Sequence, residues 1–273
     1  MEQSKIRKPA VAGQFYPSSS QELKNRIETL IDKKAEKSDV IACMLPHAGY
    51  MYSGAVAAQT VSRINIKNKI ILLGPNHTGY GRAYSIMTDG IWQTPLGEIK
   101  IDSNLAKSML SRSRYLEEDS LAHTYEHSLE VELPFLQYFK PDFEIVPIIV
   151  LSEEINILRD IGKDISYAIK DLNIRDSAMI VASSDMTHYE PQGQAAKKDK
   201  QAIQAILDLD EYELMERVQK LNISMCGYAP VVVMLAAAKL LGAQKSSLIK
   251  YQTSGDITGE KDSVVGYAGI IIY

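Results

Sequence analysis

The chain has 273 residues, of which 45% are hydrophobic and 23% are charged, and its formal net charge is -4. This composition is ordinary for a protein with a sizeable buried core and argues against intrinsic disorder. The small negative charge argues against a nucleic-acid partner, and no apolar run reaches the roughly 18 residues of a membrane helix. Because the opening residues lack the apolar stretch of a secretory signal, we expect a cytoplasmic protein with no membrane partner.

No linker, charge block or repeat divides the chain, so we expect one domain over residues 1–273. Two cysteines, Cys43 and Cys226, are too few for a disulfide scaffold. In a reducing compartment we expect both to be free thiols.

The first predicted elements are an extended segment and a helix. Residues 7–17 contain two prolines and are expected to run extended over the surface of the core. The spacing from Ser19 to Glu22 is that of a capping box, which predicts the start of an amphipathic helix. Its apolar stripe consists of Leu23, Ile27, Leu30 and Ile31.

A β-α-β unit is predicted next. Residues 40–45 and 70–73 are apolar enough for buried strands, and a helix of small residues begins at 54–58 between them. Residues 82–101 favour a hairpin or the edge of a sheet, and residues 103–110 favour a short helix.

The middle of the chain predicts two more helices and a strand. Residues 125–133 favour a helix that Pro134 kinks or ends. Residues 143–151 predict a buried strand despite Pro147. Ser152 is the expected N-cap of an amphipathic helix with an apolar stripe of Leu158, Ile161, Ile165 and Ile169.

The rest of the chain continues the alternation of strands and helices. Strands are expected at 178–182, 247–253 and 263–273, and helices at 195–209, 211–221 and 228–241. This order favours an α/β fold with a central, mostly parallel sheet and helices on both faces. The pattern does not give the order or direction of the terminal strands.

Histidines follow three of the predicted strands directly. His47, His77 and His188 each lie in a loop just after an apolar run. In open α/β sheets the working site lies outside the carboxyl ends of the strands, so these side chains are expected to share a pocket. One such histidine alone would be a hydrogen-bonding loop residue, but three together suggest a metal site, since imidazole binds iron, copper and zinc.

Asp185 and His127 are weaker candidates. Asp185, three residues before His188, is equally consistent with a turn, a metal ligand or a carboxylate that orients a histidine. His127 lies in a polar segment and alone would be a structural or surface residue. His123 is expected to share its helix face, but Thr124 follows it, so the pair lacks the glutamate of HExxH. No phosphate loop, dinucleotide fingerprint or nucleophile elbow occurs.

Cys226 precedes the helix predicted at 228–241. A buried, inert thiol is one interpretation, and it is the better one for Cys43 inside its apolar strand. Near a helix N-terminus, however, the pKa of a thiol can fall, which would make Cys226 a soft metal ligand or a redox group.

Taken together, eight segments resemble the Memo-like family, also described as protein B of the AmmeMemoRadiSam system. They extend from residue 7 to the final predicted strand, in the order found in the family: RKPAVAGQFYP, PHAGYMYSG, GPNHTG, TPLGEIKID, EHSLEVELPF, SSDMTHY, MCGYAP and TSGDITGEKDSVVGYA.

The resemblance implies a fold similar to class III extradiol dioxygenases, which open catechol-type rings with non-heme Fe(II). It places His47 and His77 as metal ligands, His188 as the acid/base residue and His127 in the pocket. Cys226 falls at the third ligand position, where those enzymes have a carboxylate, so ring opening does not carry over directly. Asp185 substitutes for that carboxylate only if it reaches the metal, and is otherwise expected to orient His188.

Two functions therefore remain open. The first is a non-heme iron- or copper-dependent redox enzyme of unknown substrate, with zinc as a further candidate metal and a radical-SAM protein as a possible system partner. The second is a catalytically inactive protein that uses the same pocket to bind a peptide or small molecule, or to act as a scaffold. Fold resemblance alone does not choose between them.

Overall fold

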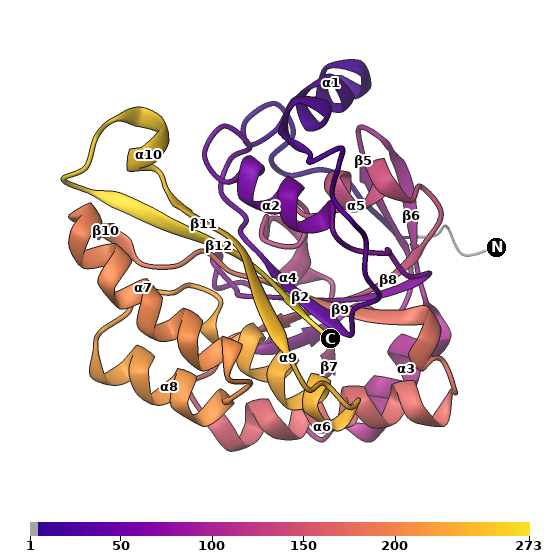
Figure 1. The fold of residues 1–273 in the computed structure, drawn as a ribbon. Coiled ribbons are helices and arrows are strands. Elements are labelled where there is room, and N and C mark those ends of the chain that lie inside the picture. The colour runs from indigo at the N-terminus through magenta and orange to yellow at the C-terminus, as the bar shows by residue number, and fades with distance from the viewer. Residues whose placement is uncertain (1–4) are drawn as a thin grey trace.

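The computed structural model describes residues 5–273 (Figure 1). A twelve-stranded sheet lies between helices on both faces. The strands are β1 (Ile6–Arg7), β2 (Ala42–Leu45), β3 (Lys69–Gly74), β4 (Tyr84–Ile86), β5 (Ile91–Thr94), β6 (Gly97–Ile101), β7 (Glu117–Glu118), β8 (Glu144–Val150), β9 (Ala178–Ser183), β10 (His188–Glu190), β11 (Ser246–Thr253) and β12 (Val264–Ile272).

Ten α-helices are present among the described residues. They are α1 (Ser20–Leu30), α2 (Gly54–Val61), α3 (Ser103–Arg112), α4 (Leu121–Thr124), α5 (Leu133–Phe139), α6 (Ile155–Asp171), α7 (Gln192–Leu207), α8 (Glu211–Lys220), α9 (Tyr228–Leu240) and α10 (Gly255–Thr258).

The centre of the sheet is parallel. Strands β6, β8, β3, β9 and β2 are neighbours in that order, and each adjacent pair is parallel. Antiparallel pairs occur towards the edges, where β12 pairs with β2, β10 and β11, and β5 pairs with β6. The predicted α/β class with a central, mostly parallel sheet is confirmed.

Helices cover both faces of this sheet, as predicted. Helices α1, α2 and α5 gather on one side, and α3, α6 and α9 on the other (Figure 1). Helix α9 contacts β2, β3, β8 and β9, and its side chains from Val231 to Leu235 are all buried. A helix with apolar residues on every side is expected in this buried place.

Most predicted elements are present. Ser19 is the N-cap of α1 and accepts a hydrogen bond from the Glu22 N–H, while Leu23 and Ile27 are buried. The predicted hairpin is the antiparallel pair β5–β6. The apolar stripe of α6, Leu158, Ile161, Ile165 and Ile169, is buried as expected.

Pro147 lies within β8 because of the strands beside it. On one side β8 pairs with β3 from Glu144 to Ile149. On the other side β6 pairs with Glu144 and Ile145, and β4 pairs only from Ile148 onwards. Pro147 lies between these two partners, so its missing N–H breaks no ladder hydrogen bond there.

Two local predictions are wrong. Residues 125–132 form no regular helix, and Pro134 lies in the first turn of α5 instead of ending a helix. Proline is tolerated there because N–H groups in the first turn have no intrahelical partner. Glu154, not Ser152, is the N-cap residue of α6, while the Ser152 hydroxyl accepts a hydrogen bond from the Glu154 N–H.

Buried Glu130 anchors the N-terminal segment to the core. Its carboxylate accepts hydrogen bonds from the Arg7 guanidinium, the Ala10 N–H at 2.7 Å, the Val11 N–H at 3.0 Å and the Tyr16 hydroxyl. A buried carboxylate needs such partners, because unpaired charge is costly away from water. Residues 7–16 therefore follow a fixed path over the core, with a turn at Gly13 that requires a φ of 86°.

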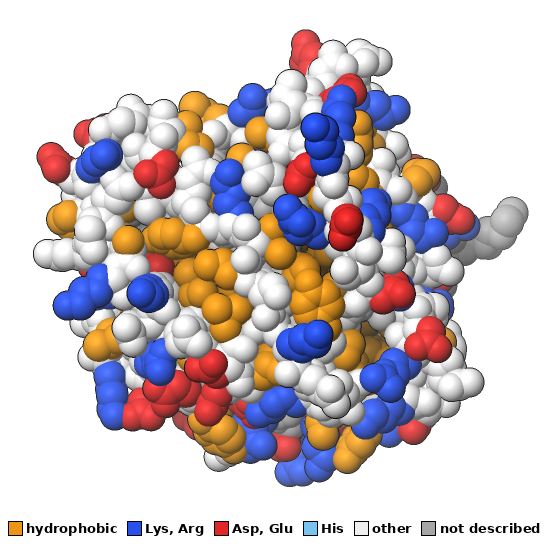
Figure 2. All heavy atoms as spheres, in the orientation of Figure 1, with side chains coloured by type: hydrophobic (Ala, Val, Ile, Leu, Met, Phe, Trp, Pro, Cys, Tyr) orange, Lys and Arg blue, Asp and Glu red, His pale blue; other side chains and the backbone are white. Residues whose placement is uncertain are grey.

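Apolar side chains gather on one face of the molecule, over the region of β11 and β12, with charged side chains around them (Figure 2). Leu248 of β11 is 39% exposed. None of the described helices has the length and apolar character needed to cross a membrane.

Candidate functional site

The carboxyl ends of the central strands bring the predicted residues together. His47 follows β2, His77 follows β3, and Asp185 follows β9. His188 is the first residue of β10, which pairs with β12 beside β2. Parallel neighbours end at the same edge of the sheet, which is why distant segments converge here.

The three predicted metal ligands form a close cluster. One ring nitrogen of His47, one of His77 and the Sγ of Cys226 all lie within 4.8 Å of one another. The ring centroids of His47 and His77 are 5.1 Å apart, and Cys226 Sγ is 3.3 Å from His47 Nε2. Two imidazoles and a sulfur at this spacing can bind one metal ion.

Glu126 fixes the orientation of His77. Its carboxylate accepts hydrogen bonds from the His77 N–H at 2.5 Å and from Nδ1 at 2.9 Å. Nδ1 therefore carries a proton, and the lone pair of Nε2 is left for a metal. Burial opposes ionisation of Glu126, but its bonds with His77 outweigh burial and lower the carboxyl pKa to about 2.

Ser183 does the same for His47. Its hydroxyl lies 2.8 Å from His47 Nδ1, and also within bonding distance of the Ser128 carbonyl and Glu132. If the hydroxyl proton goes to either of these acceptors, Nδ1–H donates to the Ser183 oxygen. The lone pair of Nε2 then faces Cys226. Burial lowers the pKa of His47, and the neighbouring histidines add to this effect.

Cys226 lies beside the start of α9 and accepts a hydrogen bond from the Asp185 N–H at 3.2 Å. The sequence left two interpretations open, a buried, inert thiol and a thiol whose pKa is lowered by the helix N-terminus. Burial raises the pKa of Cys226, and the charge of Asp185 raises it further. Desolvation of a thiolate outweighs the helix terminus in the protein without a cation, whereas a bound metal ion would favour the thiolate.

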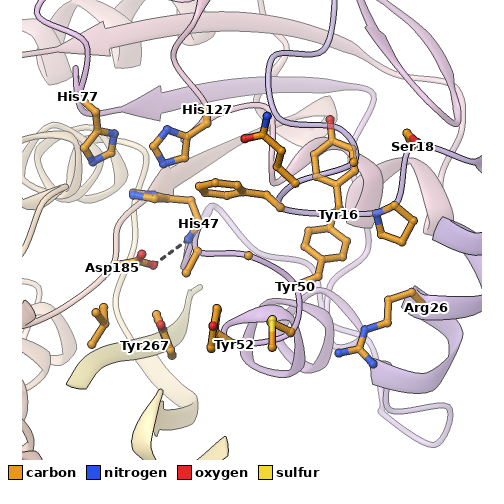
Figure 3. Close-up of a pocket in the computed structure, with 18 of the residues that line it drawn as sticks. Tyr16, Ser18, Arg26, His47, Tyr50, Tyr52, His77, His127, Asp185 and Tyr267 are labelled. Carbon is orange, nitrogen blue, oxygen red and sulfur yellow. Dashed lines mark hydrogen bonds between the residues drawn. The ribbon is translucent and has the colours of Figure 1, made fainter. Parts of the chain in front are cut away.

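Asp185 is buried at the edge of this cluster. Its Oδ1 accepts a hydrogen bond from the His47 backbone N–H at 2.9 Å, drawn as the dashed line in Figure 3. Burial raises the pKa of its carboxyl to about 6. Asp185 thus orders the loop that carries His47, and among the described contacts it makes no hydrogen bond with an imidazole ring.

His188 is oriented by Ser224 and not by Asp185. Its Nδ1 lies 2.8 Å from the Ser224 carbonyl oxygen, and its backbone N–H donates to the Ser224 hydroxyl at 2.7 Å. A carbonyl only accepts, so Nδ1 carries a proton and donates it to Ser224, and Nε2 takes no part in this bond. His188 lines the same cavity as His47 and His77.

His127 joins the cluster, and His123 does not. The His127 ring lies 4.7 Å from that of His77 and 5.5 Å from that of His47, measured between centroids. His123 is instead buried against Trp92, 6.0 Å away, and α4 ends at Thr124. The expectation that both share one helix face is therefore wrong.

A cavity of about 820 Å³ opens from the histidines. His47, His77 and His127 lie together at one end with Asp185 and Tyr267 nearby, and Tyr16 and Tyr50 lie further along the cavity (Figure 3). Residues 13–18 of the N-terminal segment form part of the wall. A cavity of this size can hold a small molecule or part of a peptide.

Sequence reasoning missed the residues that orient the imidazoles. Glu126, Ser183 and Ser224 bond to His77, His47 and His188 respectively. Glu126 also contributes to a second group of potential ligands with His77 and His127. The unusual polarity of residues 124–130 was a signal for Glu126, but spacing did not show which side chain turned inwards.

Comparison with known proteins gives a consistent result over nearly the whole chain. Residues 7–271 match the family model described as Memo-like protein. The MEMO1 family protein MJ0403 of Methanocaldococcus jannaschii is 44% identical, covering 98% of this chain and 99% of the relative. A MEMO1 family protein of Aquifex aeolicus is 43% identical, with the same two coverages of 98% and 99%.

One solved structure shows a similar fold at much lower identity. It is described as that of uncharacterized protein JW3007 from Escherichia coli K12 and has a TM-score of 0.56 and 12% identity. The match covers 85% of this chain and 99% of that one. At this identity the similarity shows the shared fold alone.

Proposed function

The chain belongs to the Memo-like family, and on that premise we propose that it is a metalloprotein that binds one iron or copper ion through His47, His77 and Cys226. Zinc is a further candidate. The single observation that carries this proposal is the convergence of two ring nitrogens and a sulfur within 4.8 Å of one another.

The donor set fits such a metal. Glu126 and Ser183 each bond to Nδ1 of a candidate ligand, which leaves the Nε2 lone pairs available. Imidazole and thiolate together suit copper, zinc and iron better than calcium or magnesium. Asp185 already bonds to the His47 N–H through Oδ1, so Cys226 is the better third ligand.

The surrounding residues suit redox chemistry on a bound small molecule. Iron or copper held here would supply electron exchange and polarisation of ligand oxygens. His188 lines the cavity and its Nε2 is not used in the bond to Ser224, and we assign this nitrogen the role of accepting and returning a proton. Asp185 orders the loop that carries His47, and His127 is part of the cavity wall.

The test is the metal content of protein purified anaerobically, measured by elemental mass spectrometry. Near-stoichiometric iron or copper is expected in the native protein. Each of His47→Ala, His77→Ala and Cys226→Ser is expected to reduce occupancy at least about tenfold, because three protein ligands leave no spare donor. His188→Ala is the matched control, since it lines the same cavity without belonging to the trio.

Two results would contradict this proposal. One is full occupancy in all three ligand variants. The other is no metal in the native protein, even after anaerobic reconstitution with Fe(II), Cu(I) or Zn(II).

A second candidate is a binding or scaffold protein without turnover. Two observations favour it: the cavity of about 820 Å³, and burial that raises the pKa of the Cys226 thiol and so keeps it neutral without a metal. Oxygen uptake by metal-loaded protein with candidate ligands separates the two. Consumption that His188→Ala slows favours the enzyme, and ligand binding without consumption favours the binding protein.

A further inference from the structure

The end of the cavity remote from the histidines carries a cation. Arg26 of α1 lines the cavity there, together with Ser18 (Figure 3). Among the described residues that line the cavity, Arg26 is the only lysine or arginine. The cavity therefore has an imidazole end and a guanidinium end, with Phe15, Tyr16 and Tyr50 between them.

The Arg26 guanidinium has no protein partner among residues 5–273. Its side chain is half-buried, yet it forms no ion pair and donates no hydrogen bond to another side chain or to the backbone. Glu22 lies one turn earlier on the same helix and lines the same cavity, but the two side chains are not paired. Five N–H donors at a cavity wall are thus left for solvent or a ligand.

The middle of the cavity is suited to an apolar group. Phe15 packs against His127 with a centroid distance of 4.9 Å, and Tyr16 packs against Tyr50 at 5.5 Å. Tyr16 and Tyr50 are no more than 3% exposed and are held by the core behind the wall, while Phe15 and Tyr52 are half-buried and leave part of each ring accessible to the cavity. Rings fixed in this way favour an apolar or planar group over a strongly hydrated one.

We propose that the cavity takes an elongated anion whose terminal oxyanion, a carboxylate or phosphate, binds the Arg26 guanidinium. Its apolar middle lies along Phe15 and the tyrosines. A guanidinium binds such oxyanions through two parallel N–H bonds. The opposite end of the ligand reaches the imidazoles, and only that part of the assignment rests on the proposed function.

The test uses two matched fluorescent probes on protein treated with a chelator. One is 8-anilinonaphthalene-1-sulfonate, and the other is N-phenyl-1-naphthylamine, which has the same rings without the sulfonate. Arg26→Gln is expected to weaken binding of the sulfonate about tenfold and to leave the neutral probe unchanged, because a charge-assisted bond is lost. Arg26→Lys should recover part of the affinity.

Lys24→Gln is the matched control. Lys24 is an exposed cation on the same helix, two residues away, and does not line the cavity. Its replacement removes the same charge and should change neither probe. Displacement of the sulfonate by 4-phenylbutanoate or by 4-phenylbutyl phosphate then shows whether the site prefers a carboxylate or a phosphate.

Three results would overturn the assignment. Arg26→Gln and Lys24→Gln could weaken binding of the sulfonate equally, or Arg26→Gln could weaken binding of both probes equally. The third result is that neither probe binds the native protein. The chelator keeps this result separate from the metal proposal. A protein without metal affinity can still show the Arg26 effect, and a protein with full metal occupancy can lack it.

Discussion

At the scale of single residues, burial decides the ionisation of His123. Burial lowers the pKa of this imidazole to about 3, and the charge of Arg7 adds to the effect. The unfolded chain takes up a proton near pH 6.5 while the folded chain does not. The free energy of unfolding therefore falls as the pH drops from 6.5 towards 3.

His123→Leu is expected to flatten this dependence. The difference between the unfolding free energies of the two proteins should change by about 1.4 kcal/mol per pH unit between pH 6 and 4. Urea unfolding at several pH values measures it. Above pH 7.5 both side chains are neutral, so the difference should be constant there. Parallel curves at acid pH would show that the pKa of His123 is the same in the folded and the unfolded chain.

The sequence predicted which histidines converge on the cavity better than it predicted the residues that orient them. His47 and His77 could be found because a loop histidine after an apolar strand is a pattern with a fixed place in an α/β sheet. Glu126 could not, since residues 125–132 follow no helical or strand period. Its partner His77 is 49 positions away, a contact that only tertiary packing creates.

At the scale of elements, the start of α9 is packed tightly against the end of β9. A Cβ added to Gly227 would lie 2.2 Å from the Ser183 carbonyl oxygen and 2.6 Å from the Ser184 Cβ. The backbone at Gly227 is not strained, with φ at -105°. The glycine is therefore required by the close approach of two elements, and Cys226 is its neighbour just before α9.

Gly227→Ala is expected to push the first turn of α9 away from β9. The cost should be about 1–3 kcal/mol of stability, and metal occupancy should fall because Cys226 moves relative to His47. Thermal unfolding and elemental analysis measure the two effects. Gly193→Ala in α7 is the control, since a Cβ there meets no atom within 4 Å. Native occupancy in Gly227→Ala would mean that this contact does not place the thiol.

The same scale explains the wrong predictions at Pro134 and Ser152. Leu129 and Leu133 have helical spacing, but the chain on either side of Leu129 turns Glu126 towards His77 and Glu130 towards Val11 instead. At Ser152 the residue type favoured a cap. The Ser152 hydroxyl accepts a hydrogen bond from the Glu154 N–H two residues later, and this contact forms a turn. The helix therefore begins after Glu154 and not after Ser152.

At the scale of the whole molecule, the metal proposal joins three distant parts of the chain. His47 follows β2, His77 follows β3, and Cys226 precedes α9. A metal ion that binds all three favours the folded state by about 2.7 kcal/mol at a hundredfold excess over its dissociation constant. For a chain of this size we expect Zn(II) to raise the melting temperature of chelator-treated protein by roughly 5–10 °C.

Differential scanning calorimetry with and without chelator measures this shift. Cys226→Ser and His47→Ala should lose most of it, while His188→Ala should keep it. An equal shift in all four proteins would place the stabilising metal elsewhere.

The fold class could be predicted from the sequence because strands and helices alternate along the chain. The antiparallel pairing of β12 with β2 could not, since it joins segments more than 200 residues apart, Ala42 with Ile272. No local pattern encodes such a pairing.

The carboxylate of Glu130 also sets the order of events during synthesis. Arg7 is synthesised 123 residues before Glu130, whose carboxylate accepts its hydrogen bond. Ala10, Val11 and Tyr16 donate to the same carboxylate and also precede it in the chain. At about 5–20 residues per second, these donors stay without their partner for on the order of ten seconds. The wall formed by residues 13–18 is therefore a late feature of the nascent protein, and a ribosome-bound chain shorter than 130 residues cannot yet hold a ligand against it.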